Sequence, residues 1–142
     1  MIRFFIIISF LFFNGCSTFK KEVVECPKLI SPKKAAEIVV NSESNLPVYL
    51  GFRGVKKFCF KDGNDIQMEL SVNIRAIRND TTKEDYVPVN ISVVSIDLNE
   101  KEFDRDEFNY SQFLLKGSKK VDRATIFELK VPAGGQVLLG IK

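Results

Sequence analysis

Alternation of apolar and polar residues is the strongest pattern in this chain, and it predicts β-strands. The clearest stretch runs from Ile66 to Ala76, where every second residue is apolar and the residues between are polar. Because successive side chains of a strand point to opposite faces of a sheet, this stretch indicates a strand with one buried and one hydrated face. Residues 125–131 and 137–141 continue the pattern, with a predicted turn at 132–135.

Residues 87–98 form a second alternating stretch, whose phase changes in the middle. The apolar residues occupy odd positions up to Val93 and even positions from Val94 onward. A one-residue slip of this kind predicts a β-bulge near Val93 and Val94. Pro88 has no N–H to donate to a ladder, so we expect it at the start of the strand or on an edge.

Shorter elements precede these two strands. Two aromatic and β-branched runs, 48–52 and 55–60, flank Gly54, and the sequence Asp-Gly-Asn-Asp at 62–65 is typical of a hairpin turn. Each run is long enough for a short strand, so this region predicts strands joined by tight turns.

Two further segments have weaker patterns. Ser31 and Pro32 favour the start of one or two helical turns that end by Val40, and the apolar run that closes this segment equally fits entry into a strand. Residues 99–109 are highly charged and predict a loop, followed by a short strand at 113–115.

These elements amount to about seven short strands with almost no helix, which predicts an all-β protein. The expected architecture is an antiparallel β-sandwich of immunoglobulin-like type. A small β-barrel is the alternative.

The first sixteen residues follow a different pattern. Arg3 precedes the mostly apolar residues 4–13, and Asn14, Gly15 and Cys16 follow. A transmembrane helix needs about 20 apolar residues, whereas the apolar part of a secretory signal needs only about 7–15. Gly15 followed by Cys16 resembles the lipobox of bacterial lipoprotein signal peptides, which implies cleavage before Cys16 and attachment of lipid to it. Plain secretion and an uncleaved anchor are the alternatives.

The chain is therefore expected to comprise a signal peptide (1–15), a lipidated tether (16–25) and one β-sandwich domain (26–142). Ser17 stands where the inner-membrane retention signal has Asp, so the resemblance implies the periplasmic face of the outer membrane. The expected partners are the membrane, through the lipid on Cys16, and another envelope protein. A nearly balanced charge, 21 Lys and Arg against 18 Asp and Glu, does not favour nucleic acid as a partner.

Cys26 and Cys59 remain as an even pair once Cys16 is assigned to the lipid. In an exported protein such a pair usually forms a disulfide, and closing a loop of about 33 residues would stabilise the fold by about 3–4 kcal/mol. Two free thiols or a redox pair are the alternatives. The Cys-x-x-Cys spacing of redox pairs does not occur in the sequence.

Several of these pieces resemble a group of small alphaproteobacterial lipoproteins that has no assigned activity. That group combines a lipobox, a Cys-Pro soon after it and a second cysteine at the start of a strand pair. The matching pieces are Gly15-Cys16, Cys26-Pro27, Gly51-Phe52 leading to Cys59, and the stretches 66–78, 86–98 and 137–141. The resemblance implies a β-sandwich protein of the cell envelope and contributes no mechanism.

The sequence offers little to a catalytic mechanism. It contains no histidine, which excludes His-based acid–base catalysis, Ser-His triads and the usual zinc sites. The acidic residues Asp104, Asp106 and Glu107 could bind calcium or act as catalytic carboxylates, and a solvated loop explains them more simply. We therefore expect no cofactor, no metal and no enzyme activity. An enzyme that used these carboxylates would lose activity in Asp104→Asn or Asp106→Asn.

Three tyrosines, Tyr49, Tyr86 and Tyr110, could line a binding face or could pack within the sandwich. The sequence thus favours a non-catalytic module that binds another envelope protein. A module that binds cell-wall glycan or lipid is the alternative.

Overall fold

The computed structural model describes residues 20–142, so the expected signal peptide and the lipidation of Cys16 lie outside the described residues. No helix within 20–142 is long and apolar enough to cross a membrane. The elements are, in chain order, β1 (Lys28–Ile30), α1 (Lys33–Ala36), β2 (Glu37–Asn41), β3 (Pro47–Asp62), β4 (Asp65–Arg78), β5 (Asp85–Ile96), β6 (Glu102–Leu114), β7 (Lys120–Pro132) and β8 (Gln136–Ile141).

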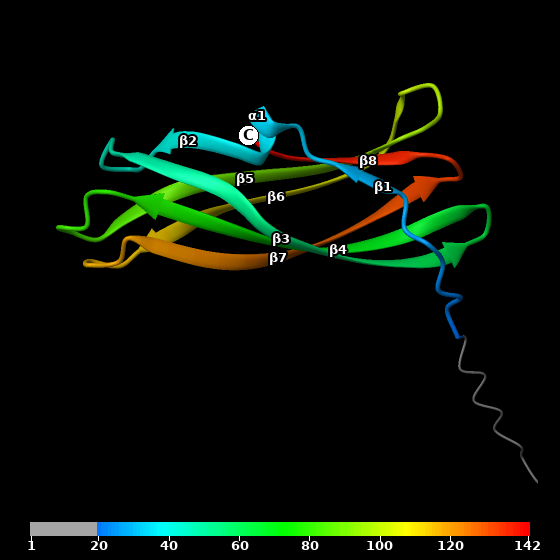
Figure 1. Cartoon of the computed structure of the whole chain (residues 1–142), viewed down its shortest axis with the longest axis horizontal. Helices are drawn as coiled ribbons and strands as arrows, with labels where there is room; N and C mark the ends of the chain where they lie inside the picture. The colour runs from blue at the N-terminus through cyan, green and yellow to red at the C-terminus, as the bar shows by residue number, and fades with distance from the viewer. Residues whose placement is uncertain (1–19) are drawn as a thin grey trace, which may run out of the picture.

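Eight strands form two four-stranded sheets that pack face to face (Figure 1). Sheet A has the strand order β2-β3-β4-β7, and sheet B has the order β1-β8-β5-β6. Neighbouring strands are antiparallel except for β1 and β8, which are parallel. The expected antiparallel β-sandwich is confirmed, with one strand more than the sequence pattern indicated.

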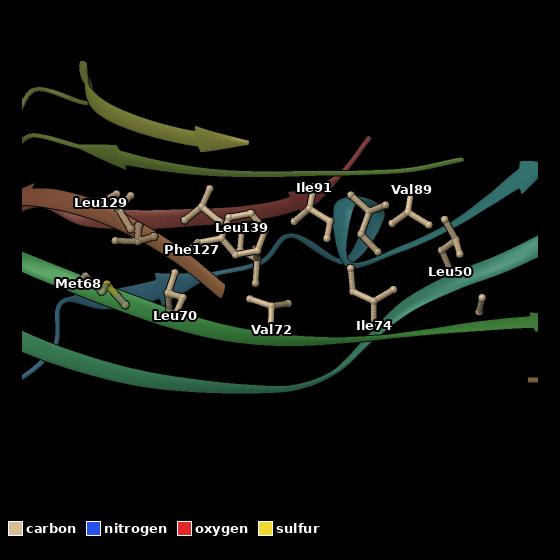
Figure 2. Packing of buried hydrophobic residues seen from close by; sticks show 14 of the residues in the cluster. Leu50, Met68, Leu70, Val72, Ile74, Val89, Ile91, Phe127, Leu129 and Leu139 are labelled. Atoms are coloured by element: carbon tan, nitrogen blue, oxygen red, sulfur yellow. The ribbon is translucent and has the colours of Figure 1, made fainter. Parts of the chain in front are cut away.

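The core lies between the sheets and is built by the alternating residues. Every second residue of β4 from Met68 to Ala76 is buried, as the sequence pattern predicts. These side chains meet Val89, Ile91 and Leu139 of sheet B (Figure 2). Burying a large aliphatic side chain stabilises a fold by about 1.5–3 kcal/mol, so this layer is what holds the two sheets together.

The two aromatic runs around Gly54 join into the single long strand β3. A register shift between Phe52 and Gly54 leaves Arg53 as an extra residue opposite β4, which is a β-bulge. β3 and β4 form a hairpin that closes at Asp62 and Asp65, as expected. Gly63 there takes a φ of +61°, which favours glycine at this position of a tight hairpin turn.

The phase change in β5 does not switch the buried face, so the predicted bulge near Val93 and Val94 is wrong in position. Ser95 is fully buried and continues the inner face after Val93. Its hydroxyl donates to the backbone carbonyl of Lys130 at 2.6 Å, so a polar residue is satisfied at a core position. The register shift follows Ser95, and Phe103 is the extra residue on β6.

The charged loop expected at 99–109 is also wrong, because most of this segment belongs to β6. β6 pairs with β5 along its length, from Glu102 to Leu114. Two of its inward positions hold the carboxylates Asp104 and Asp106, and aromatic residues such as Phe103 lie on its outer face, so the hydrophobic alternation of this strand is interrupted.

The N-terminal segment visits both sheets. Val23 forms a bridge to Phe60 at the edge of sheet A, before the expected domain start at Cys26. The chain then crosses to sheet B as β1, makes the single turn of α1, and returns to sheet A as β2. The sequence left residues 32–40 open between a short helix and entry into a strand, and the structure has both, one after the other.

A disulfide between Cys26 and Cys59 lies where the chain leaves sheet A. The two Cα atoms are 5.2 Å apart, and Cys59 is buried in the core. The expected pairing is thus present, and it ties the crossing segment to β3.

Candidate functional site

The outer face of sheet A has a row of small residues across its centre. The strand register places Gly54 of β3 beside Asn73 of β4, and Asn73 beside Ala124 of β7. Because two of these three residues have little or no side chain, the row forms a hollow of about 340 Å³, which also contacts Lys56 and Ser71. We call this feature the sheet A hollow.

Asn73, which lines the hollow, carries an unused hydrogen-bond acceptor. The side-chain Oδ1 of Asn73 is buried and has no hydrogen-bond partner among residues 20–142. Buried polar atoms in folded proteins are nearly always paired, and leaving one unpaired costs about 1–3 kcal/mol. This atom has almost no exposed surface, so a group that enters the hollow reaches it once the Asn73 side chain turns towards the hollow.

Two exposed apolar residues, Phe58 of β3 and Ile126 of β7, lie on the same face of sheet A near the hollow. Phe58 is 56% exposed, and Ile126, which is in register with Ser71, is 65% exposed. Large apolar residues at these exposures are typical of surfaces that bind a partner when they gather around a concave site. The hollow thus combines two apolar contacts, a buried acceptor and the cation Lys56 at its rim.

A bidentate ion pair lies in the next row of the same face. Arg75 donates to both carboxylate oxygens of Asp122, at 2.7 and 2.8 Å. The hydrogen bond from Arg75 lowers the pKa of Asp122, so this carboxylate stays ionised. The pair fixes β4 against β7 beside the hollow and leaves neither group free for chemistry.

The acidic residues predicted as candidates have structural partners. An Oδ2 atom of Asp104 accepts the backbone N–H of Lys130 at 2.7 Å, and Asp106 accepts that of Glu128 at 3.0 Å. Both amides belong to β7, which is the edge of sheet A, so the carboxylates join the edges of the two sheets. No group of residues in the described chain is arranged to hold a metal ion.

Glu107, the third acidic candidate, belongs to a polar network on the outer face of sheet B. Lys142 and Arg105 donate to its Oε1 at 2.6 and 2.7 Å. The hydrogen bond from Lys142, followed by that from Arg105, lowers the pKa of Glu107 to about 2. A carboxylate held ionised in this way is a poor general acid or base at neutral pH.

The three tyrosines do not form one binding face. Tyr49 lies on the outer face of sheet A over Gly51, whereas Tyr86 lies on the outer face of sheet B against Phe113, with ring centroids 5.1 Å apart. Tyr110 faces inward at the side of the sandwich, with the Arg123 guanidinium 4.1 Å from its ring centroid. Each ring therefore packs locally, on a different surface.

A buried arginine organises the end of the sandwich opposite the β3–β4 hairpin. Arg78 is 4% exposed and donates to four backbone carbonyls, those of Lys83, Leu114, Leu115 and Ser118, at 2.7–3.4 Å. Its guanidinium joins the β4–β5 loop to the β6–β7 turn, so its role is to stabilise this end of the fold.

The sequence reasoning missed the sheet A hollow. Its residues are small or polar and look like ordinary exposed positions, and they come together only through the register of three strands. Comparison of the chain with protein-family models, curated proteins and solved structures finds no significant match. The site is therefore argued from its geometry alone.

Proposed function

We propose that the protein is a non-catalytic lipoprotein of the cell envelope that binds another envelope protein. Lipid on Cys16 anchors it to the periplasmic face of the outer membrane, as the lipobox-like Gly15-Cys16 implies. The observation that carries the binding role is the sheet A hollow with its exposed apolar rim.

The contacts of the hollow suit a protein partner. Phe58 and Ile126 supply apolar area near it, and the Asn73 acceptor needs one N–H or O–H donor from the partner. Interfaces between proteins commonly combine apolar contacts with a few fixed hydrogen bonds in this way.

A cell-wall glycan or a lipid is the second candidate ligand. The same Asn73 acceptor could bind a sugar hydroxyl, and the exposed ring of Phe58 could lie against the apolar face of a sugar. This alternative keeps the anchor and the site but changes the class of ligand.

In-cell cross-linking followed by mass spectrometry tests the proposal. One protein should recur with the native chain, and its recovery should fall in Cys16→Ser, because loss of the anchor removes the module from the membrane. Gly54→Leu should abolish recovery by filling the hollow. A Cβ at Gly54 meets no atom within 4 Å, so this change fits the fold.

Ser111→Leu adds the same side chain to the exposed outer face of sheet B and serves as the matched control. If Gly54→Leu and Ser111→Leu reduce recovery equally, the hollow is not the binding site. Retention of the purified domain on isolated cell wall or lipid vesicles, with no protein cross-linked in cells, would contradict the protein-binding role and support the second candidate.

A further inference from the structure

We propose that the protein partner presents an extended acidic segment, which adds as a strand to the uncovered edge of β3. This inference rests on the proposed function, because it takes the partner to be a protein. It identifies the chemistry of the partner and the backbone that binds it.

The edge of β3 is uncovered only in its middle. β2 pairs with residues 47–51 of β3, and residues 22–24 pair with residues 59–61. Between them, no strand of the described chain runs along residues 52–58, because the chain has crossed to sheet B to form β1. The opening fits a strand of about five residues, which is a common strand length.

The backbone at this edge is already oriented for pairing. Lys61 donates its N–H to Glu22 at 2.8 Å, and Cys59 accepts from Val24 at 3.0 Å, so these odd-numbered residues direct their backbone groups outward. Antiparallel pairing alternates along a strand, which places the N–H and C=O groups of Val55 and Lys57 on the same side. Unpaired groups of this kind are a template for a further strand.

Three cationic side chains around the opening favour a partner with negative charge. Arg53, Lys56 and Lys57 are exposed, and none forms an ion pair within residues 20–142. Lysines at a sheet edge disfavour pairing there, because a neutral strand would take their charge out of water and a basic strand would be repelled. An acidic segment neutralises them, so the charges that exclude other strands favour this one.

Gly54 connects the edge to the sheet A hollow. Gly54 belongs to the uncovered stretch 52–58, is in register with Asn73 of β4, and lines the hollow. Because glycine has no side chain, a long side chain of the added strand can pass over Gly54 into the hollow and, when the Asn73 side chain turns towards it, donate a hydrogen bond to Oδ1. Backbone pairing would supply affinity, and this one side chain would supply specificity.

The test is in-cell photo-cross-linking of the full-length protein from three separate positions. A photoreactive residue replaces Lys56 beside the edge, Ile126 across the hollow, or Phe113 on the outer face of sheet B. The cross-linked partner segment is then mapped by mass spectrometry. We expect capture from Lys56, on a segment that carries a net negative charge.

Edge variants combined with the Lys56 probe identify the mode of binding. Lys57→Pro removes an outward N–H and should lower the cross-link yield about tenfold or more, whereas Lys57→Thr keeps the N–H and should lower it less. The double change Arg53→Glu and Lys57→Glu should also abolish capture. The same charge reversal at Lys116 and Lys119, in the β6–β7 turn, should leave the yield unchanged.

The outcomes separate this inference from the proposed function. Capture from Ile126 or Phe113 but not from Lys56, or a mapped segment without acidic residues, overturns the edge-strand inference and leaves a protein-binding module in place. Equal yields from Lys57→Pro and Lys57→Thr also overturn it. No capture from any of the three positions contradicts the proposed function itself.

Discussion

At the scale of single residues, two of the buried polar side chains, Ser95 and Arg78, donate their hydrogen bonds to backbone carbonyls. Ser95 donates to a carbonyl of β7, and Arg78 donates to carbonyls of two loops. The Ser95 bond joins β5 of sheet B to β7 at the edge of sheet A, and the Arg78 bonds fix loop segments that have no ladder of their own.

Replacing Arg78 tests this role. Arg78→Met removes every donor and should lower the free energy of unfolding by about 2–4 kcal/mol, because buried carbonyls lose their partner. Arg78→Lys should lower it less, since an ammonium reaches fewer carbonyls than the planar guanidinium. Urea unfolding of Cys16→Ser protein measures both values. The exposed Lys116→Met is the control, with an expected change within about 0.5 kcal/mol. Equal stability of Arg78→Met and wild type would contradict the role.

Glu107 predicts a specific dependence of stability on pH. Lys142 and Arg105 lower its folded-state pKa to about 2, below the value of about 4.3 expected in the unfolded chain. A lowered pKa stabilises the fold above the unfolded value, and this contribution is lost as the pH falls towards 2. The melting temperature of wild type should therefore exceed that of Glu107→Gln at pH 7, with a difference that shrinks below about pH 4.5.

Thermal unfolding between pH 7 and 2 measures this difference. Lys142→Gln removes the first partner of Glu107 and should flatten the dependence over the same range. A difference between wild type and Glu107→Gln that stays constant with pH would contradict the assignment.

At the scale of elements, the edges of β6 and β7 are held together by side chains instead of a backbone ladder. Asp104 and Asp106 of β6 accept two outward N–H groups of β7. Arg123 of β7 lies over the rings of Tyr110 and Phe108 on β6. The carboxylates occupy amides that another chain could otherwise pair with, which protects this side of the sandwich from edge-to-edge association.

The double variant Asp104→Ala/Asp106→Ala tests the protection of the β7 edge. It should lower the free energy of unfolding by about 1–2 kcal/mol and also promote self-association, because the amides of Glu128 and Lys130 become free to pair. Urea unfolding and sedimentation velocity measure the two effects. Glu84→Ala, at an exposed loop position, should change neither. A variant that is destabilised but stays monomeric at all concentrations would contradict the protective role.

The same elements explain which parts of the structure the sequence predicts. β4 can be predicted from its sequence, because one of its faces is apolar and the other is polar along the whole strand. β6 does not, because its inward residues include carboxylates that face the amides of another strand. In β5, Ser95 conceals a core position, because its hydroxyl has a partner 35 residues away.

The candidate site was harder to predict for a related reason. Gly54, Asn73 and Ala124 belong to three strands, and only the β3–β4–β7 register brings them together. Their polarity and small size are consistent with any exposed position of a sheet. The sequence therefore predicts the layers and the disulfide pair, whereas the hollow and the uncovered edge depend on pairing that local patterns do not encode.

At the scale of the whole molecule, the segment that crosses from sheet A to sheet B determines both the uncovered edge of β3 and the attachment of residues 22–24 to that strand. The disulfide joins Cys26 to β3 after a loop of 33 residues, and residues 22–24 pair with the same strand beside it. The loop that it closes contains β1, α1, β2 and most of β3.

Removing this disulfide should destabilise the whole domain. The double variant Cys26→Ser/Cys59→Ser, in a Cys16→Ser background, should lose about 3–4 kcal/mol of unfolding free energy, because the unfolded chain regains the freedom of that loop. Urea unfolding with and without reductant measures it, and reduced protein with both cysteines should match the variant. Unfolding of the oxidised protein that does not change on reduction would contradict a stabilising bridge.

The position of the disulfide also determines how the domain responds to mechanical force. A load on the N-terminus first breaks the few hydrogen bonds of residues 22–24, and then reaches a covalent bond to β3 in the body of sheet A. β1, α1 and β2 are bypassed, because the bridge carries the tension around them. Oxidised protein pulled by its ends should thus extend about 110 Å less than reduced protein, which is the extended length of the 33-residue loop minus the 5.2 Å between the bridged Cα atoms. If the proposed lipid on Cys16 bears the load, the disulfide protects the domain from being peeled apart from that end.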